Sequence, residues 1–326
     1  MGLLSRLKRS YSARYRSDTA GDSARALRAA GIVDNGSPAP KQDSEVVEKY
    51  WTDHNVTLHR IYASEEDSFA DVSWRNAQYF RYIDLMPVTG TDGLSVLDFG
   101  CGPGYDLVGF ATQSKPKRLI GVDVSSSSLA EAEARLALHG VTAELHHHDV
   151  LKFPLPIAEE SVDLVHSSGV LHHLPAMEVA LAELRRVLKP GGQAQFMVYH
   201  ADSLWVHLYV AFERQILQGL DSDLDLTAAF QKSTDGPGCP ISRCYTQKQF
   251  TDIVSAVGFQ FDSFGVAVSA WEMSLLPKRF AAIMDARLPA QSRDFLAGLT
   301  FDERGLPLTR AGVHAGIDAC FRFRAV

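Results

Sequence analysis

Runs of apolar residues without polar alternation divide the middle of this chain. A strand that helices cover on both faces has no solvent-facing positions, so such runs predict the buried strands of a parallel sheet. Each run ends at a polar, acidic or glycine-rich stretch, which is where a loop is expected. The predicted strands are residues 94–99, 119–123, 145–150, 162–168, 195–199, 258–264 and 318–323.

Segments that favour helices lie between these strands. In one of them, Glu131 and Arg135 stand four residues apart, and this spacing predicts an ion pair on the solvent face. Because helices and strands alternate, the chain is expected to form an α/β sheet with helices on both faces. Two further helices are expected to begin near Ser44 and near Asp106. Another is expected to carry Trp74, Tyr79 and Tyr82 and to end at Met86. The remaining expected helices are 129–138, 177–188, 201–219 and 246–257.

Three glycines at alternate positions, Gly100, Gly102 and Gly104, end the first strand. Glycine permits positive φ and has no Cβ, so the backbone can turn sharply and lie against a ligand, with the N–H groups of the following helix at the same place. The second strand ends at Asp123, whose carboxylate can accept two hydrogen bonds from a ribose diol. The GxGxG spacing argues against a nicotinamide enzyme, which normally shows GxGxxG.

The chain resembles class I S-adenosylmethionine-dependent methyltransferases of the Rossmann-like, small-molecule type. The resemblance rests on VLDFGCGPG at 96–104, GVD at 121–123, the His148–Asp149 pair and LKPGG at 188–192, and it covers about residues 94–200. It implies a doubly wound, mostly parallel seven-stranded sheet whose last strand is antiparallel. It also implies that S-adenosylmethionine is the cofactor.

The resemblance assigns roles to residues at the strand ends. Asp98 would act on the cofactor's ammonium group, the three glycines on its methionine part and Asp123 on its ribose. Asp149 would accept from the adenine 6-amino group, and the Val150 N–H would meet a ring nitrogen. The complete set expected to bind the cofactor is Arg75, Asp98, Gly100, Cys101, Gly102, Gly104, Asp123, Val124, Asp149, Val150 and Ser167.

A hydroxyl acceptor must lose a proton as it attacks the methyl group, and histidine is the side chain best suited to take it near neutral pH. His172 and His173 directly follow the fourth strand, and His200 ends the fifth. Asp106 is a rival base, and His173 has an alternative structural role in tying its loop to a helix. Alignment of the two substrates without a base is also open, because the methyl group is already activated.

The histidine triplet is the only local pattern that suggests a metal. His146 and His148 would share one face of a strand and His147 the other. A catalytic zinc ion takes three protein ligands, and no neighbouring HxxxH or CxxC motif offers a third. The sequence therefore predicts no metal.

Four hypotheses on function remain open. The leading one is an O- or N-methyltransferase for a small molecule, such as a metabolite, a sugar or a lipid-linked intermediate. The alternatives are C-methylation of an isoprenoid or ring carbon, and a non-catalytic regulatory protein that binds S-adenosylmethionine. A macromolecular acceptor is disfavoured, because the net charge of −7 is opposite to what nucleic-acid binding requires.

The first 40 residues differ in composition from the rest. Residues 1–30 hold seven Arg or Lys against two Asp, and 36–40 are rich in Pro, Gly and Ser. A mobile basic tail is predicted for 1–40, with weak contact to a membrane surface left open. A helical segment, 41–90, would cover the cofactor and acceptor, and the methyltransferase domain would be 91–326 with cap insertions at about 201–245 and 266–315.

The cysteine pattern and the apolar content of the chain indicate its expected location and partners. The four cysteines form no CxxC pair or disulfide framework, which favours a cytoplasmic location. No run of eighteen apolar residues is present, so no integral membrane contact is expected. The expected partner is a small-molecule acceptor and not nucleic acid, and a homodimer is left open.

Overall fold

The computed structural model describes residues 44–149, 152–236 and 238–326. The predicted tail, 1–40, and Val150 lie outside the described residues. The division into a tail, a helical segment and a catalytic domain therefore stays a prediction.

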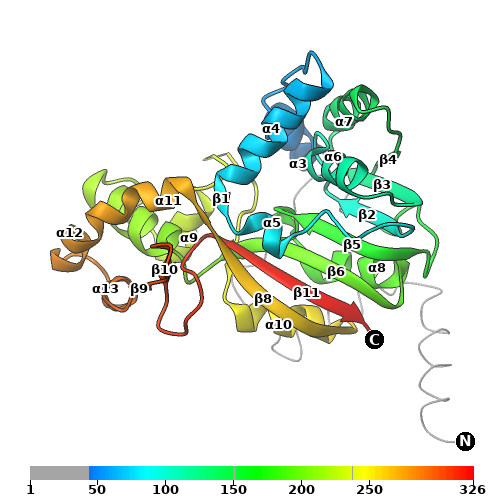
Figure 1. Cartoon of the computed structure of the whole chain (residues 1–326). Coiled ribbons are helices and arrows are strands. Elements are labelled where there is room, and N and C mark those ends of the chain that lie inside the picture. The colour runs from blue at the N-terminus through cyan, green and yellow to red at the C-terminus, as the bar shows by residue number, and fades with distance from the viewer. Residues whose placement is uncertain (1–43, 150–151, 237) are drawn as a thin grey trace, which may run out of the picture.

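A nine-stranded sheet forms the centre of the molecule (Figure 1). Its order is β1-β8-β11-β6-β5-β2-β3-β4, with β7 beside β6, and β11 runs antiparallel to both of its neighbours. The predicted doubly wound sheet with an antiparallel last strand is confirmed, and the two-residue strands β1 and β7 are additional to the expected seven. The strands are β1 Tyr79–Phe80, β2 Ser95–Phe99, β3 Arg118–Asp123, β4 Glu144–His147, β5 Val162–Ser168, β6 Leu188–His200, β7 Cys244–Tyr245, β8 Phe259–Ser269 and β11 Asp318–Ala325, while β9 Thr300–Phe301 and β10 Pro307–Leu308 pair separately.

Helices cover both faces of the sheet. Figure 1 shows α4, α6 and α7 on one side and α8 and α10 on the other. The helices are α3 Ser44–Asp53, α4 Glu65–Ala77, α5 Tyr82–Leu85, α6 Tyr105–Gln113, α7 Ser126–Leu138, η1 Leu171–His173, α8 Met177–Val187, η2 Trp205–Leu217, α9 Leu226–Gln231, α10 Gln247–Ala256, α11 Ala270–Leu275, η3 Leu276–Lys278, α12 Arg279–Met284 and α13 Ala290–Ala297.

Successive side chains of a strand point to opposite faces of the sheet, so the apolar core is divided between the two helical layers that cover those faces. In β2, Val96 packs with the α6 and α7 residues, whereas Leu97 and Phe99 pack with α8 and α10. All five residues of β2 are buried, which explains why its sequence shows no alternation. The central strands are thereby fixed in register, and their carboxyl ends lie along one edge of the sheet.

Two inserted segments form a helical cap at one end of the sheet, where Figure 1 shows α9, α11, α12 and α13. Leu208 and Phe212 of the first segment share an apolar cluster with Leu288 and Leu296 of the second. The second segment starts after Ser269, because β8 continues four residues beyond the expected 266 boundary to pair with β11 and β1. Among the described residues, no helix has the length and apolar composition needed to cross a membrane.

Two local expectations were wrong. Tyr79 lies in strand β1, paired with Ser269, and not in the helix that carries Trp74. Arg135 does not pair with Glu131 at the surface: it is buried, and its guanidinium donates to the hydroxyl and carbonyl oxygens of Ser68 on α4. The i,i+4 spacing predicts which residues are neighbours on a helix, but not which face another helix covers.

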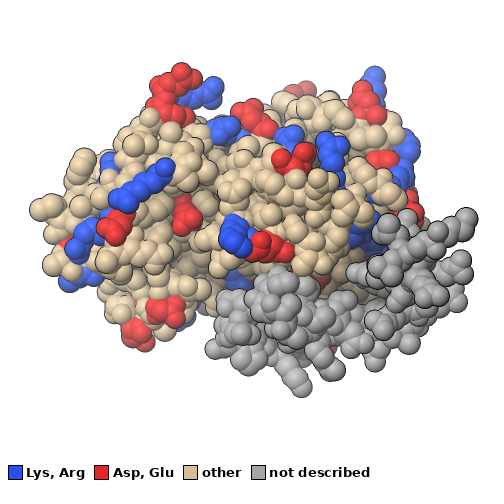
Figure 2. Space-filling view, turned by 90° about the horizontal axis from the view of Figure 1, so that it is seen from below, with Lys and Arg blue, Asp and Glu red and all other residues tan. Residues whose placement is uncertain are grey.

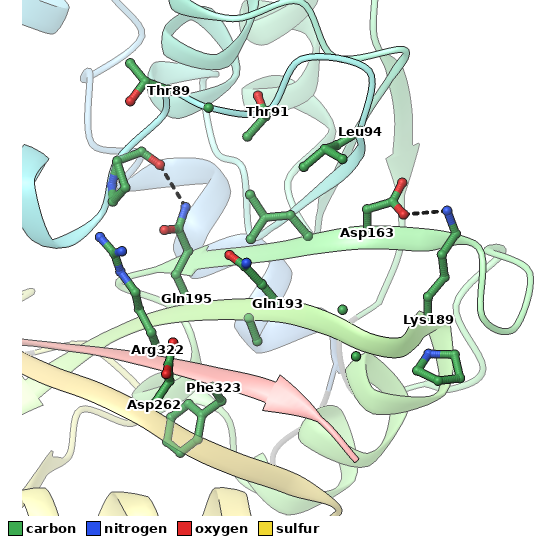
Figure 3. Close-up of a pocket in the computed structure, with 17 residues that line it drawn as sticks. Thr89, Thr91, Leu94, Asp163, Lys189, Gln193, Gln195, Asp262, Arg322 and Phe323 are labelled. Carbon is green, nitrogen blue, oxygen red and sulfur yellow. Dashed lines mark hydrogen bonds and ion pairs between the residues drawn. The ribbon is translucent and has the colours of Figure 1, made fainter.

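A polar pocket of about 370 Å³ opens at the amino ends of β2, β5 and β6, opposite to the glycine turn (Figure 3). Its polar groups largely bind one another: Lys189 pairs with Asp163 at 2.5 Å, and Gln195 donates to the Pro87 carbonyl at 3.0 Å. None of the residues that the sequence assigned to cofactor or catalysis lines it. The functional site therefore has to be sought at the other edge of the sheet.

Candidate functional site

The glycine turn follows β2 and presents bare backbone to open space. Gly100, Gly102 and Gly104 all have positive φ, at 79°, 51° and 83°. A Cβ on Gly100 would overlap the Val170 side chain, whereas a Cβ on Gly102 would meet no atom within 4 Å. Gly100 is therefore required by packing, and Gly102 leaves room in which a ligand can approach the main chain.

Asp123 links this turn to the end of β3. Its carboxylate accepts hydrogen bonds from the backbone N–H of Gly102 at 2.8 Å and of Ser125 at 2.9 Å. Burial raises the pKa of this carboxyl despite those N–H donors. A carboxylate has about four lone-pair positions, so Asp123 can hold the turn and still accept from two hydroxyl groups.

Asp98, on β2, is a buried carboxyl in a negatively charged environment. Burial raises its pKa to about 7, and the neighbouring carboxylates Asp106 and Asp123 add to that rise. His166 and Arg75 act in the opposite direction without cancelling it. A ligand cation beside Asp98 would favour the ionised form, which fits a group that carries an ammonium and a sulfonium charge.

Asp106 is the centre of a buried polar network (here called the Asp106 network). Arg75 of α4 forms an ion pair with one carboxylate oxygen, and His166 Nε2 of β5 lies 3.1 Å from the other. Burial would raise the pKa of Asp106, but Arg75 and His166 hold it well below its usual range. The network continues through the Tyr82 hydroxyl, 2.6 Å from Ser168 Oγ.

This network changes the interpretation of two predicted residues. Arg75 does pair with a carboxylate, but that carboxylate is Asp106 of the same chain. Asp106 stays ionised and hydrogen-bonded, so it is poorly suited to act as the base. Sequence reasoning missed His166 and Gln195, whose side-chain nitrogens lie 3.0 Å apart, because both belong to strands that looked purely structural.

The remaining residues of the predicted cofactor set lie along the same strand ends. Ser167 donates to the Phe99 carbonyl at 2.9 Å and joins β5 to β2. Cys101 is buried, and burial raises the pKa of its thiol well above the ordinary value. The Val124 carbonyl lies 2.9 Å from His147 Nε2, and Asp149 pairs with Lys152 at 3.0 Å.

His172 lies in η1, at the carboxyl end of β5, and is fully buried. Its ring packs against Tyr199 and His173, with centroid distances of 3.9 and 4.1 Å. Neither ring nitrogen has a hydrogen-bond partner among the described residues. Burial holds its pKa well below the ordinary value, so the imidazole is neutral and can accept a proton or a hydrogen bond.

The other two histidines have different environments. His200 ends β6, and burial lowers its pKa to about 4. His173 Nδ1 donates to the Ile241 carbonyl at 2.6 Å, and its Nε2 lies 3.7 Å from an Asp235 oxygen. His173 therefore ties η1 to the loop that precedes β7, in keeping with the structural alternative raised for it.

Comparison with known proteins identifies a domain that includes this site. Residues 96–192 match a family described as "Methyltransferase domain". This range contains the glycine turn, Asp123, Asp149 and His172. This segment is a methyltransferase domain of the class I S-adenosylmethionine-dependent type. The methyl donor of this family is S-adenosylmethionine, and the open space at Gly102 and the acidic surroundings of Asp98 fit it.

Two relatives illustrate how far the similarity extends. The probable methyltransferase ltbC of Aspergillus luteorubrus is 30% identical over 154 residues, which are 41% of this chain and 53% of the relative. The malonyl-[acyl-carrier protein] O-methyltransferase of Erwinia billingiae is 34% identical over 116 residues, which are 36% and 43% of the two chains. The chain thus spans about half the length of the curated relatives that it matches.

A solved structure with a similar fold is the geranyl diphosphate C-methyltransferase of Streptomyces coelicolor. It covers 89% of this chain and 100% of its own, with 14% sequence identity and a TM-score of 0.49. At this sequence identity and TM-score, the similarity gives no information about the acceptor of this chain.

Proposed function

We propose that this methyltransferase moves the methyl group of S-adenosylmethionine to an oxygen or nitrogen atom of a small-molecule acceptor. The observation that carries the proposal is the His172 imidazole, fully buried with both nitrogens unpartnered among the described residues. A buried polar group without a partner costs about 1–3 kcal/mol, so a role in binding a proton or an acceptor hydroxyl accounts for it.

The chain's own residues prepare the reaction in three ways. The glycine turn and Asp123 hold the cofactor-binding backbone in place, and Asp98 supplies negative charge for the cofactor's cationic end. When bound, the cofactor supplies an activated methyl group. His172, neutral because of its burial, takes the proton that a hydroxyl loses as it attacks, or the proton that a neutral amine loses once its nitrogen has been methylated.

Mixed charge on the surface accords with a small acceptor. Figure 2 shows basic and acidic side chains interspersed over the face that it presents, among mostly uncharged residues. A long nucleic acid binds best to a continuous basic surface. Support for an oxygen acceptor comes from the malonyl-[acyl-carrier protein] O-methyltransferase relative.

The test uses His172→Phe, which keeps the ring and its contact with Tyr199 but removes both nitrogens. We expect wild type to release S-adenosylhomocysteine with at least one member of a panel of phenols, hydroxy acids, amines and prenyl diphosphates. The variant should bind S-adenosylhomocysteine normally in calorimetry, while its rate falls by about 10²–10⁴-fold.

Three results would contradict the proposal in different ways. Turnover with prenyl carbon alone favours C-methylation. An unchanged rate in His172→Phe shows that alignment is sufficient and that His172 is not the base. Tight cofactor binding without release from any panel member favours the non-catalytic alternative.

A further inference from the structure

Three potential metal ligands converge outside the cofactor site. His173 of η1 lies beside Asp235 and Cys239 of the loop before β7, and one ligand atom from each residue lies within 4.8 Å of the others. His173 and Cys239 are separated by 66 residues, so the fold and not local spacing brings them together. We call these three residues the His173 cluster.

The orientation of His173 is the first argument that the cluster is built for a cation. Its Nδ1 is 2.6 Å from the Ile241 carbonyl, an acceptor, so this nitrogen carries the ring proton. The other nitrogen, Nε2, then points a lone pair toward Asp235 Oδ2, 3.7 Å away. In the neutral ring, two acceptors, Nε2 and Asp235 Oδ2, therefore face each other. No described residue donates a hydrogen bond to Nε2, and a bound cation would relieve this contact.

The backbone carbonyl behind the ring matches the usual environment of a metal-binding histidine. Such histidines commonly donate the second ring N–H to a carbonyl or carboxylate, which fixes the tautomer and orients the free nitrogen. The Ile241 carbonyl has this position here. A histidine that served only as a tie between two loops would need the Nδ1 contact alone and would not need Asp235 at its other nitrogen.

Asp235 is held in place by groups that do not neutralise it. The Tyr199 hydroxyl donates to Oδ1 at 3.0 Å, and the Thr234 and Ser242 hydroxyls donate to Oδ2 at 2.6 and 3.3 Å. Among the described residues, the structure shows no Lys or Arg within ion-pair distance of this carboxylate. Hydroxyl donors of this kind orient a metal-binding carboxylate and leave its negative charge available.

Cys239 completes the donor set. Its thiol donates to the Ile241 carbonyl at 3.3 Å, and its Sγ lies 3.8 Å from His173 Nδ1, the nitrogen that carries the ring proton. To share a cation with Nε2 and Asp235, the sulfur would turn away from that carbonyl. A bound divalent ion would form a bond to sulfur while the thiol proton leaves to solvent, so binding would release about one proton.

The combination of sulfur, nitrogen and oxygen donors selects the type of ion. Thiolate and imidazole favour zinc-like ions, whereas magnesium and calcium require oxygen ligands. We propose that His173, Asp235 and Cys239 bind one Zn²⁺ ion, whose fourth position is left to water. Three protein ligands and an exchangeable fourth position are the coordination of zinc sites that are open to a substrate.

The histidine triplet, from which the sequence predicted no metal, is a different place in the fold. His147 Nε2 lies 2.9 Å from the Val124 carbonyl and 3.2 Å from Glu48, and His148 contacts the Lys152 carbonyl. These contacts turn the rings toward separate partners. The triplet serves as an internal control for adventitious zinc binding to exposed histidines.

The test is metal binding by the full-length protein without a tag, after chelator treatment. We expect one Zn²⁺ per chain in calorimetry, release of about one proton, and a higher melting temperature with Zn²⁺ than without. Co²⁺ should give the near-ultraviolet absorption of a thiolate–cobalt bond. Cys239→Ser keeps a small polar side chain, so its metal-free melting temperature should match wild type while its zinc affinity falls at least about 100-fold.

Two matched variants separate this site from others. Cys244→Ser removes a different buried thiol, and His147→Gln removes a ring of the triplet; both should bind zinc as wild type does. The proposal is overturned if wild type binds no Zn²⁺, if the cobalt complex lacks the thiolate band, or if His147→Gln abolishes binding. The readout needs neither acceptor nor cofactor, so its failure would leave the proposed methyl transfer untouched.

Discussion

Protonation of Asp98 is expected to control cofactor affinity between pH 5.5 and 7. Its pKa is raised to about 7 in the free protein, and the charged groups that face it are His166, Asp106, Asp123 and Arg75. A cofactor ammonium beside it favours the carboxylate, so the bound form binds fewer protons than the free form. At pH 5.5 nearly every free molecule must lose a proton on binding, and at pH 7 about half must. The affinity for S-adenosylhomocysteine should then rise about 15-fold over this range, or about 1.6 kcal/mol.

The same raised pKa of Asp98 determines how the folding stability changes with pH. The pKa of Asp98 is higher in the folded than in the unfolded chain, so its contribution to stability is full at low pH. That contribution is lost as the pH rises through about 7. The ligand restores favourable charge contacts there, so the ligand-induced rise in melting temperature should be larger at pH 7 than at pH 5.5.

Calorimetry at several pH values tests this prediction, and two variants decide its origin. In Asp98→Asn the pH dependence should disappear, because no carboxyl remains to lose a proton. Asp163→Asn, at the opposite edge of the sheet, should keep the wild-type slope. The range stops at pH 7 because an α-amino group itself begins to titrate near 7.7–8.0. The reasoning is refuted by a wild-type affinity that changes less than about twofold, or by an unchanged slope in Asp98→Asn.

Three further predictions concern single residues of the site. Arg75→Met should lower the free energy of unfolding by about 3–5 kcal/mol in urea denaturation, because Asp106 would stay buried without its cation, and adding Asp106→Asn should recover part of the loss. His172→Phe should raise stability by about 1–3 kcal/mol, since it removes two buried nitrogens without partners among the described residues, and a destabilised variant would show that a partner was lost. Gly102→Ala and Gly140→Ala both place alanine at positive φ in open space, so both should cost about 1–2 kcal/mol, but only Gly102→Ala should weaken S-adenosylhomocysteine binding in calorimetry.

The sequence predicts the sheet well because each central strand carries a local signal. β2 is buried on both faces, so its apolar run is continuous, and the glycines after it mark the turn. The limits of β8 were wrong by several residues, because its last part depends on pairing with β11 and β1, which lie far away in sequence. The predicted surface ion pair of Arg135 was wrong for the same reason. Whether the Arg135 face of α7 is buried depends on where α4 packs, and the sequence of α7 does not show this.

The residues of a site could be predicted from the sequence only where one short segment of the chain contains them all. The glycines and Asp123 lie within 24 residues and form one unit. The Asp106 network instead joins α4, α6 and β5, and the His173 cluster joins η1 to a loop more than 60 residues away. Neither has a spacing that a linear pattern can reveal. Histidines in a strand and a cysteine in a glycine-rich loop carry no signal until the fold brings their partners beside them.

The cofactor site and the surroundings of His172 are built from different parts of the chain, and this has a consequence for acceptor specificity. The segment that matches the methyltransferase domain family, 96–192, contains His172 and all of the predicted cofactor-binding residues except Arg75. The groups that surround His172 and His173 come largely from outside that range: Trp51 lies against the His173 ring, Tyr199 against His172, and Asp235 faces His173 from the inserted loop. If the acceptor binds beside His172, it is recognised by residues that the family match does not cover. Substitutions at Trp51 or Tyr199 should therefore change which acceptor is methylated more than they change cofactor affinity, and equal effects on both would place the acceptor elsewhere.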